Sequence, residues 1–327
     1  MPERAHRFVV LDGLRGAAAL LVISDHIPSV IWNIAPSRAL AVDFFFVLSG
    51  FVLAHAYGDR LSYSMSVHTF MKRRLIRLYP LYILGSALGA LLVIAQALKG
   101  WMAVTPGEFA IVSFFGITFL PCPPLFDWTA NAPFPFDAPA WSLFFELIAN
   151  LLLGYFAFLR RLRSLMLFLP IAAIALIYFT LQSGTFDMGW NYETFPGGAA
   201  RLAYSFFVGV LIYNLWKRGY RWHLPAIAAF LLLFVVATGA ALFDGTLRMA
   251  WDLCMQLLCI PMIVALAANA SVSRPFAKLC SALGDLSYGI YMLHIRKRPA
   301  WTPLTGSILE VPGCQVRDAI DRMIGDP

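Results

Sequence analysis

Residues 14–26 read LRGAAALLVISDH, an apolar run that opens with an arginine and closes with an aspartate and a histidine. The run belongs to a chain of 327 residues that is 60% hydrophobic and only 13% charged. This charged fraction is roughly half that of an ordinary soluble domain. A soluble core cannot bury so much apolar surface, so the sequence predicts an all-α membrane protein.

Apolar blocks recur along the chain, and most are long enough to cross a hydrocarbon layer of ~30 Å. Phe109–Leu120 is short for a span and runs into Pro121, Pro123 and Pro124, so we expect a re-entrant or interfacial segment. With it, we predict a polytopic transmembrane helical bundle of about nine to ten membrane segments. The expected spans are 8–31, 39–57, 76–98, 139–159, 164–182, 199–216, 224–243 and 249–270, with a ninth from Leu279.

The net charge of +7 is confined to short basic clusters between the apolar blocks. Such clusters are typical of cytoplasmic loops, which favours membrane topology over nucleic-acid binding as the reason for the positive charge. We therefore expect a bacterial plasma-membrane protein with a cytoplasmic N-terminus, in contact with membrane lipids and not with nucleic acid. The clusters are Arg4 with Arg7, Lys72–Arg77, Arg160–Arg163 and Lys217–Arg221.

The remaining global features set the domain organisation. The five cysteines are odd in number and lack paired metal-ligand spacing, so we expect neither a disulfide framework nor a metal site. Asp12 and Arg15 precede the first apolar run, which favours a retained helix over a cleaved signal peptide. Residues 1–295 form the predicted membrane domain, and residues 296–327 form a polar tail that we expect to be poorly ordered.

The first span is expected to carry a polar stripe. Asp12 precedes Arg15 by three residues, and His26 follows Arg15 by eleven, which is close to three helical turns. All three side chains therefore share one face, with Arg15 and His26 ~16 Å apart. The stripe is typical of a wet cavity between helices. An arginine that extends toward the inner interface beside Asp12, with His26 at the outer interface, is the structural alternative.

Further polar groups lie in or near other spans. Glu146 sits among Leu and Phe, where a carboxylate needs a proton or a cationic partner, and a structural hydrogen bond is the alternative. Asp43 begins the second span, where it suits helix capping. Arg74 and Arg77 are three residues apart and share a face, so they suit either a phosphorylated ligand or anchoring to anionic lipid.

Six stretches together carry a resemblance to a known family. In chain order they resemble the acyltransferase 3 family of integral membrane acyltransferases, and the likeness covers residues 7 to about 295. The chain departs from the family after residue 294, where basic and polar sequence replaces a long apolar helix. The stretches are LDGLRGAAALLVISDH (11–26), DFFFVLSGFVLAHAY (43–57), KRRLIRLYP (72–80), PAWSLFFELIANLL (139–152), RLAYSFFVGVLIY (201–213) and LGDLSYGIYMLH (283–294).

The resemblance implies transfer of an acyl group, often acetyl, from cytoplasmic acyl-CoA to a hydroxyl of a carbohydrate or lipid-linked glycan. Acyl-CoA is then a co-substrate, and no tightly bound cofactor is expected. The family's arginine-to-histidine pair falls on Arg15 and His26, its R-x-x-R element on Arg74 and Arg77, and its Trp-Ser and glutamate element on Trp141, Ser142 and Glu146.

These positions define the predicted site. Catalysis is assigned to His26, Glu146 and Asp12. Acyl-CoA binding is assigned to Arg15, Lys72, Arg73, Arg74 and Arg77. Substrate positioning is assigned to Trp141, Ser142 and Asp43.

Two routes for His26 stay open, general base and transient acyl carrier. A secondary transporter or glycan exporter, a structural partner of a glycan-assembly complex, and an inactive truncated family member are the alternative functions.

Overall fold

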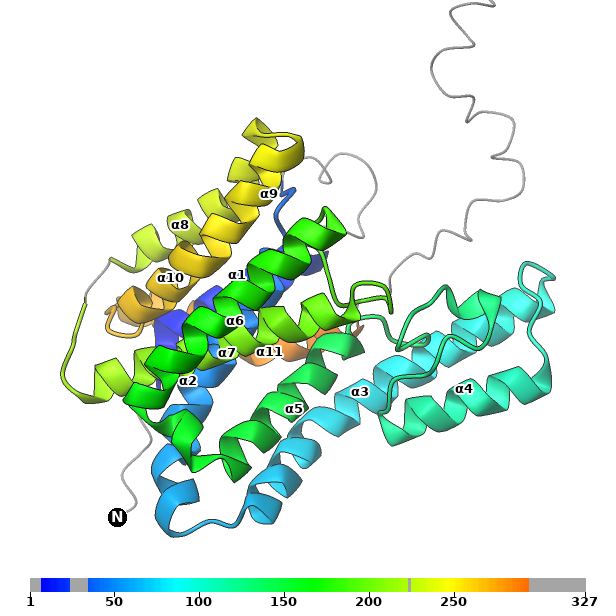
Figure 1. The fold of residues 1–327 in the computed structure, drawn as a ribbon, viewed down its shortest axis with the longest axis horizontal. Coiled ribbons are helices and arrows are strands. Elements are labelled where there is room, and N and C mark those ends of the chain that lie inside the picture. Colours follow the sequence, from blue (N-terminus) through cyan, green and yellow to red (C-terminus); the bar gives the residue numbers. More distant parts are fainter. Residues whose placement is uncertain (1–6, 24–34, 223–224, 294–327) are drawn as a thin grey trace, which may run out of the picture. The chain divides into compact units, whose positions relative to one another are not determined.

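The computed structural model describes residues 7–23, 35–222 and 225–293, and the regular structure of these residues is helical (Figure 1). The α-helices are α1 (Val9–Ile23), α2 (Leu40–Tyr63), α3 (Val67–Leu98), α4 (Pro106–Thr118), α5 (Ala140–Tyr155), α6 (Leu162–Ser183), α7 (Phe195–Lys217), α8 (Ala226–Thr238), α9 (Gly245–Cys254), α10 (Ile260–Ala267) and α11 (Arg274–Leu293). Three 3₁₀ segments, η2 (Asp127–Thr129), η3 (Ala157–Arg160) and η4 (Gly239–Leu242), and one π segment, η5 (Met255–Cys259), complete them.

Five helical stretches in the described part are long and apolar enough to cross a membrane. They are α2, α3, α6, α7 and the continuous stretch Gly245–Ala267, in which η5 joins α9 to α10. The apolar surface of α6 points outward, with Leu167 75% and Ile174 67% exposed. Because such a surface suits hydrocarbon and not water, the prediction of a polytopic helical membrane bundle is confirmed.

Several helix boundaries differ from the sequence prediction. The third span, expected from residue 76, begins at Val67, because the Ser66 side chain accepts a hydrogen bond from the Thr69 amide and caps the helix. The basic cluster Lys72–Arg77 therefore lies inside α3 and not in a loop before it. The span expected at 224–243 is divided into α8 and η4.

Helix α4 is the short segment that the sequence predicts as re-entrant or interfacial. Its 13 residues extend ~20 Å, less than the ~30 Å of a full crossing. A capping box of Thr105 and Glu108 begins the helix, and Phe119 ends it in the left-handed conformation. The hydroxyl groups of Tyr79 and Tyr82 donate to carbonyls of Ile117 and Gly116, which fixes α4 along α3 (Figure 1). Its depth in a membrane stays a prediction.

Glycines set the closest helix contacts. A Cβ at Gly50 of α2 would lie 1.9 Å from the carbonyl oxygen of Phe206 in α7, and a Cβ at Gly209 of α7 would lie 2.0 Å from that of Val47. At the α2–α7 crossing, neither Gly50 nor Gly209 can therefore be replaced by a larger residue without moving the helices apart. Helices α1 and α11 also pack along each other, where Gly16 meets Leu283. These two contacts bring the polar residues of α1, α2 and α11 toward one interior.

Candidate active site

A cavity of about 430 Å³ lies between α1, α2, α3, α5 and α11. Its apolar wall comes largely from α2, including Phe45, Phe46 and Val52. The polar part of its wall collects side chains that are far apart in sequence. These are Arg15, Ser49, Tyr57, Arg74, Arg77, Ser142, Glu146, Asp285, Ser287, Tyr288 and Tyr291.

Arg15 enters this cavity from α1. Its Nε donates to the Ser287 hydroxyl at 2.8 Å, and its Nη2 donates to the Gly284 carbonyl at 2.6 Å. The Asp12 carboxylate lies 3.4 Å from the same guanidinium, as the three-residue spacing predicts. Arg15 therefore faces the bundle and α11, not the surrounding lipid.

Asp12 lies outside the cavity wall. Its carboxylate accepts from Arg7 at 2.8 Å as well as facing Arg15, so it connects the start of α1 to the arginine of the cavity. A direct catalytic role for Asp12 stays a prediction, and these contacts support a role in positioning Arg15.

Arg74 and Glu146 form an ion pair across the cavity. Arg74 Nη2 donates to Glu146 Oε1 at 2.5 Å, and the two side chains are only 6% and 15% exposed. The Ser49 hydroxyl donates to the same carboxylate oxygen at 2.7 Å. The sequence predicts that Glu146 needs a cationic partner, and Arg74 of the R-x-x-R element is that partner. The Arg74 Nε makes no hydrogen bond within the described residues.

The other members of the basic cluster are placed differently. Arg77 lies one turn after Arg74, is exposed, and lines the cavity. Lys72 and Arg73 are exposed and do not line it. Within the predicted acyl-CoA set, the geometry therefore separates Arg15, Arg74 and Arg77 from Lys72 and Arg73.

Ser142 lines the cavity and Trp141 does not. The Ser142 hydroxyl lines the cavity and lies 2.7 Å from the Tyr291 hydroxyl of α11. Trp141 is buried on another side of α5, against Phe46 and the guanidinium of Arg201. Of the two residues, Ser142 is the one whose side chain reaches the cavity.

Asp43 belongs to a separate buried network. Both of its oxygens are bound by the Arg201 guanidinium, at 3.3 and 2.7 Å, and both side chains are fully buried. Gln256 Nε2 donates to Asp43 at 2.8 Å and to Ser205 at 2.9 Å from the π segment η5. The N-cap position of α2 is Ala39, and the contacts of Asp43 are those of a structural ion pair. Substrate positioning by Asp43 stays a prediction.

His26, the predicted catalytic histidine, lies outside the described residues, as does the predicted tail 296–327. Helix α1 is described as far as Ile23, three residues before it.

Helix α11 contributes side chains to the cavity that the sequence did not predict. Ser287, Tyr288 and Tyr291 all line the cavity, and the sequence predicted no role for these three residues. The available signal was the spacing of these hydroxyl groups, which places them on one face of a helix. The sequence likewise predicted no role for Arg201, the partner of Asp43, which is the first residue of the stretch RLAYSFFVGVLIY.

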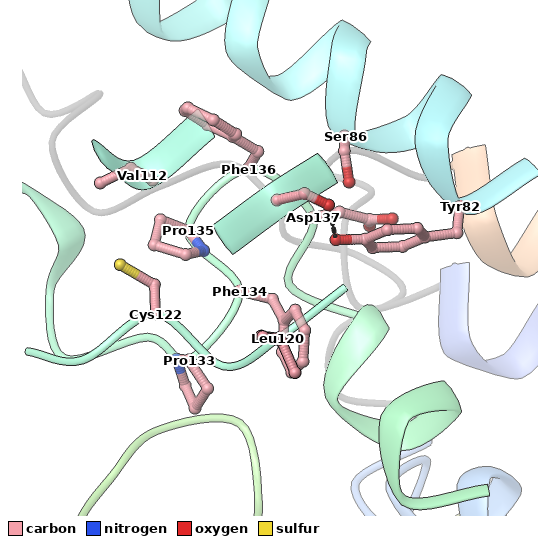
Figure 2. Close-up of a pocket in the computed structure, with 11 residues that line it drawn as sticks. Tyr82, Ser86, Val112, Leu120, Cys122, Pro133, Phe134, Pro135, Phe136 and Asp137 are labelled. Carbon is pink, nitrogen blue, oxygen red and sulfur yellow. Dashed lines mark hydrogen bonds between the residues drawn. The ribbon is translucent and has the colours of Figure 1, made fainter. Parts of the chain in front are cut away.

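Another buried carboxylate lies in the loop between α4 and α5. Asp137 is 5% exposed, and its Oδ2 makes no hydrogen bond within the described residues. It borders a pocket of about 10 Å³, room for a single water, beside Tyr82 and Ser86 of α3 (Figure 2). Burial raises the pKa of the Asp137 carboxyl to about 8, so the group is largely neutral at pH 7.

The described residues contain no group of three or more His, Cys, Asp or Glu side chains arranged to hold a metal ion. The chemistry of the cavity wall is instead that of guanidinium, hydroxyl and carboxylate groups. Guanidinium groups bind phosphates and carboxylates through paired hydrogen bonds, so this wall suits an anionic ligand.

Comparison with known proteins identifies the family of the chain. A family model described as an acyltransferase domain matches residues 8–308. The chain belongs to this acyltransferase family. The family model covers α1 to α11, and therefore every helix that contributes to the cavity of this acyltransferase.

Three relatives illustrate the range of the family. "Protein 2 in picA locus" of Rhizobium radiobacter is 39% identical over 52% of the acyltransferase and 93% of its own length. "Acyltransferase MdmB" of Streptomyces mycarofaciens is 26% identical over 90% of the chain and 80% of its own length. "Exopolysaccharide production protein ExoZ" of Rhizobium meliloti is 26% identical over 78% and 75%. No solved structure matches the chain.

Proposed function

We propose that this membrane acyltransferase moves an acyl group, acetyl in the simplest case, from acyl-CoA to a hydroxyl of a carbohydrate or lipid-linked glycan. The observation that carries the proposal is the cavity into which Arg15, Arg74 and Arg77 project together from two helices. An acyl-CoA is an anion whose phosphates need guanidinium partners and whose arm needs an apolar wall. The cavity offers both features.

Arg77 is the best candidate for first contact with the CoA phosphates. It is exposed at the cavity wall and forms no ion pair with a described residue. Arg74 lies deeper and is already paired with Glu146, so it offers a guanidinium in a fixed orientation. Lys72 and Arg73 lie outside the cavity and suit contact with anionic lipid heads instead.

The chemical step needs a base for the acceptor hydroxyl. In the proposed reaction the hydroxyl oxygen attacks the thioester carbon, an ester C–O bond forms, and the C–S bond breaks. His26 accepts the hydroxyl proton and returns it to the departing CoA thiolate. An acyl-histidine intermediate is the second route, and it gives the same products. Glu146 serves this step by holding Arg74, and Ser142 with Tyr291 offers hydroxyl groups to the acceptor.

The acceptor class rests on the relatives. ExoZ is named for exopolysaccharide production, and this name supports a glycan acceptor for the present chain. The bacterial relatives support a bacterial plasma membrane. The basic clusters support an orientation with the N-terminus and the Lys72–Arg77 end of α3 in the cytoplasm, where acyl-CoA is available.

Acyl-CoA turnover by the purified full-length chain tests this function. We expect release of free CoA thiol that depends on a glycan acceptor and that is lost in His26→Ala at a normal protein level. Mass spectrometry of surface polysaccharide, with and without the gene, identifies the added group and its recipient. Wild-type acylation by His26→Ala would remove His26 from the chemistry, and transport without thiol release would contradict acyl transfer.

A further inference from the structure

A second and larger cavity, of about 600 Å³, lies at the C-terminal ends of α2, α5 and α7. None of the residues that line it also lines the candidate active site, because the two cavities lie on different faces of α2. Its floor is apolar and includes Ala54 and Val210, both buried. Its rim is polar and includes Arg160, Arg161 and Lys217.

The positive charge of this rim is not balanced. Lys217 is paired with Asp59 at 2.6 Å, and Asp59 is the one carboxylate of the described residues that borders the cavity. The Nη1 of Arg160 donates hydrogen bonds to the main-chain carbonyls of Leu153 and Gly154. Arg161 has no side-chain ion pair within the described residues. Burial and the adjacent charge of Arg161 lower the pKa of Arg160, as expected where two cations lie close together.

The position of the cavity points to the membrane surface. The turn after Tyr63 of α2 leads directly into α3, and Gly154 of α5 contacts Val67 at the start of α3. The cavity therefore lies at the same end of the helices as the basic cluster Lys72–Arg77. Tyr63 and Tyr155 border it and are 89% and 68% exposed, a placement typical of aromatic residues at the lipid headgroup level.

We propose that this cavity binds the phosphate headgroup of an anionic phospholipid, with Arg160 and Arg161 on the phosphate and the apolar floor against the glycerol region. A soluble phosphate could use the same two guanidinium groups. The apolar floor and the exposed tyrosines favour the lipid, because they contribute to binding only when the phosphate belongs to an amphiphile. Basic pockets between helix ends at the cytoplasmic side of a membrane bind anionic lipids in this way. The inference does not depend on the proposed acyl transfer.

Titration of the purified full-length chain with phosphatidylglycerol, followed by native mass spectrometry, tests the proposal. Arg161→Gln should bind phosphatidylglycerol about fivefold more weakly than wild type, as expected for the loss of one cation near the headgroup, and Arg161→Glu more weakly still. Arg161 suits this test because its side chain is exposed, whereas Arg160 also holds the end of α5.

Arg163→Gln is the matched control. It removes the same charge two residues away, from an exposed side chain that does not line the cavity, and should leave binding at the wild-type level. Equal binding by Arg161→Gln and wild type, or an equal loss in Arg163→Gln, would overturn the site in favour of diffuse surface charge. Displacement of phosphatidylglycerol by inorganic phosphate or by CoA at equal phosphate concentration would overturn the assignment to a lipid. Phosphatidylcholine should bind all variants alike and weakly.

Discussion

Arg74 in α3 and Glu146 in α5 form a buried ion pair, 72 residues apart in the chain, in the wall of the candidate active site. The pair has two consequences. It fixes the R-x-x-R element of α3 against the helix that carries Ser142, and it compensates a guanidinium that would otherwise be costly so far from water. Ser49 of α2 donates to the same carboxylate, so three helices meet at one oxygen.

Glu146→Gln should destabilise the protein because it leaves the Arg74 charge buried without a counter-charge. Removing one partner of a buried ion pair lowers the free energy of unfolding of soluble proteins by about 3–5 kcal/mol. We expect a clear fall in the Tm of this variant in detergent. The double variant Glu146→Gln with Arg74→Gln should recover part of that fall, because it removes both charges. A Glu146→Gln protein with wild-type Tm but no activity would instead make Glu146 a catalytic residue.

Arg77→Ala should raise the KM for acyl-CoA at least about tenfold, the effect of losing a charge-assisted phosphate contact of about 1.5–3 kcal/mol. Its Tm should stay near wild type, because Arg77 is exposed and holds no described ion pair. Arg73→Ala is the matched control, with the same charge change in the same basic cluster but outside the cavity. Equal KM changes in both variants would mean that the cluster acts through general charge and not through a binding site.

For the Asp43–Arg201 pair we expect a loss of stability and not a loss of substrate binding. Both side chains are fully buried and paired at 2.7 Å outside the cavity wall, so Asp43→Asn should lower Tm and expression. The fraction that folds should keep nearly wild-type kcat and KM for the acceptor. Kinetics normalised to folded protein, measured by size-exclusion chromatography, check this. A wild-type Tm with a raised acceptor KM would instead support the substrate-positioning role that the sequence predicts for Asp43.

The sequence predicted the features that depend on local periodicity. Apolar block length gave the helical membrane bundle, and three-residue spacing gave the contact of Asp12 with Arg15. The same spacing placed Arg74 and Arg77 at one cavity. These predictions hold because a helix fixes the relative direction of side chains three or four residues apart whatever the tertiary fold.

The sequence did not predict the features that depend on helix pairing. The partners of Glu146 and Asp43 are Arg74 and Arg201, which lie on helices far along the chain, and nothing local selects one arginine over another. The capped start of α3 at Ser66 was missed because the hydrophobic pattern there is masked by the basic cluster. The hydroxyl groups of α11 reach the cavity because α11 packs along α1, and the sequence of α11 alone does not predict this pairing.

Asp137 should make stability depend on pH. This loop carboxyl lies outside the membrane-spanning helices, and burial raises its pKa to about 8 from an ordinary value near 3.8. Between these two values the folded state holds a proton that the unfolded state has lost. The stability contributed by the neutral carboxyl is therefore fully present below about pH 3.8 and is lost as pH rises toward 8.

Asp137→Asn replaces the neutral acid with a neutral amide of similar shape, which removes this dependence. We expect the Tm of wild type to fall relative to that of the variant as pH rises from about 4 to about 8, because the unfolded wild-type chain releases a proton that the folded carboxyl keeps next to Gly85 and Tyr82. Thermal unfolding across this pH range measures the difference. Asp127→Asn, at an exposed position in the same loop, controls for the change in net charge. Parallel pH profiles for wild type and Asp137→Asn would mean that the carboxyl is ionised in the folded protein, with its second oxygen hydrated through the small pocket of Figure 2.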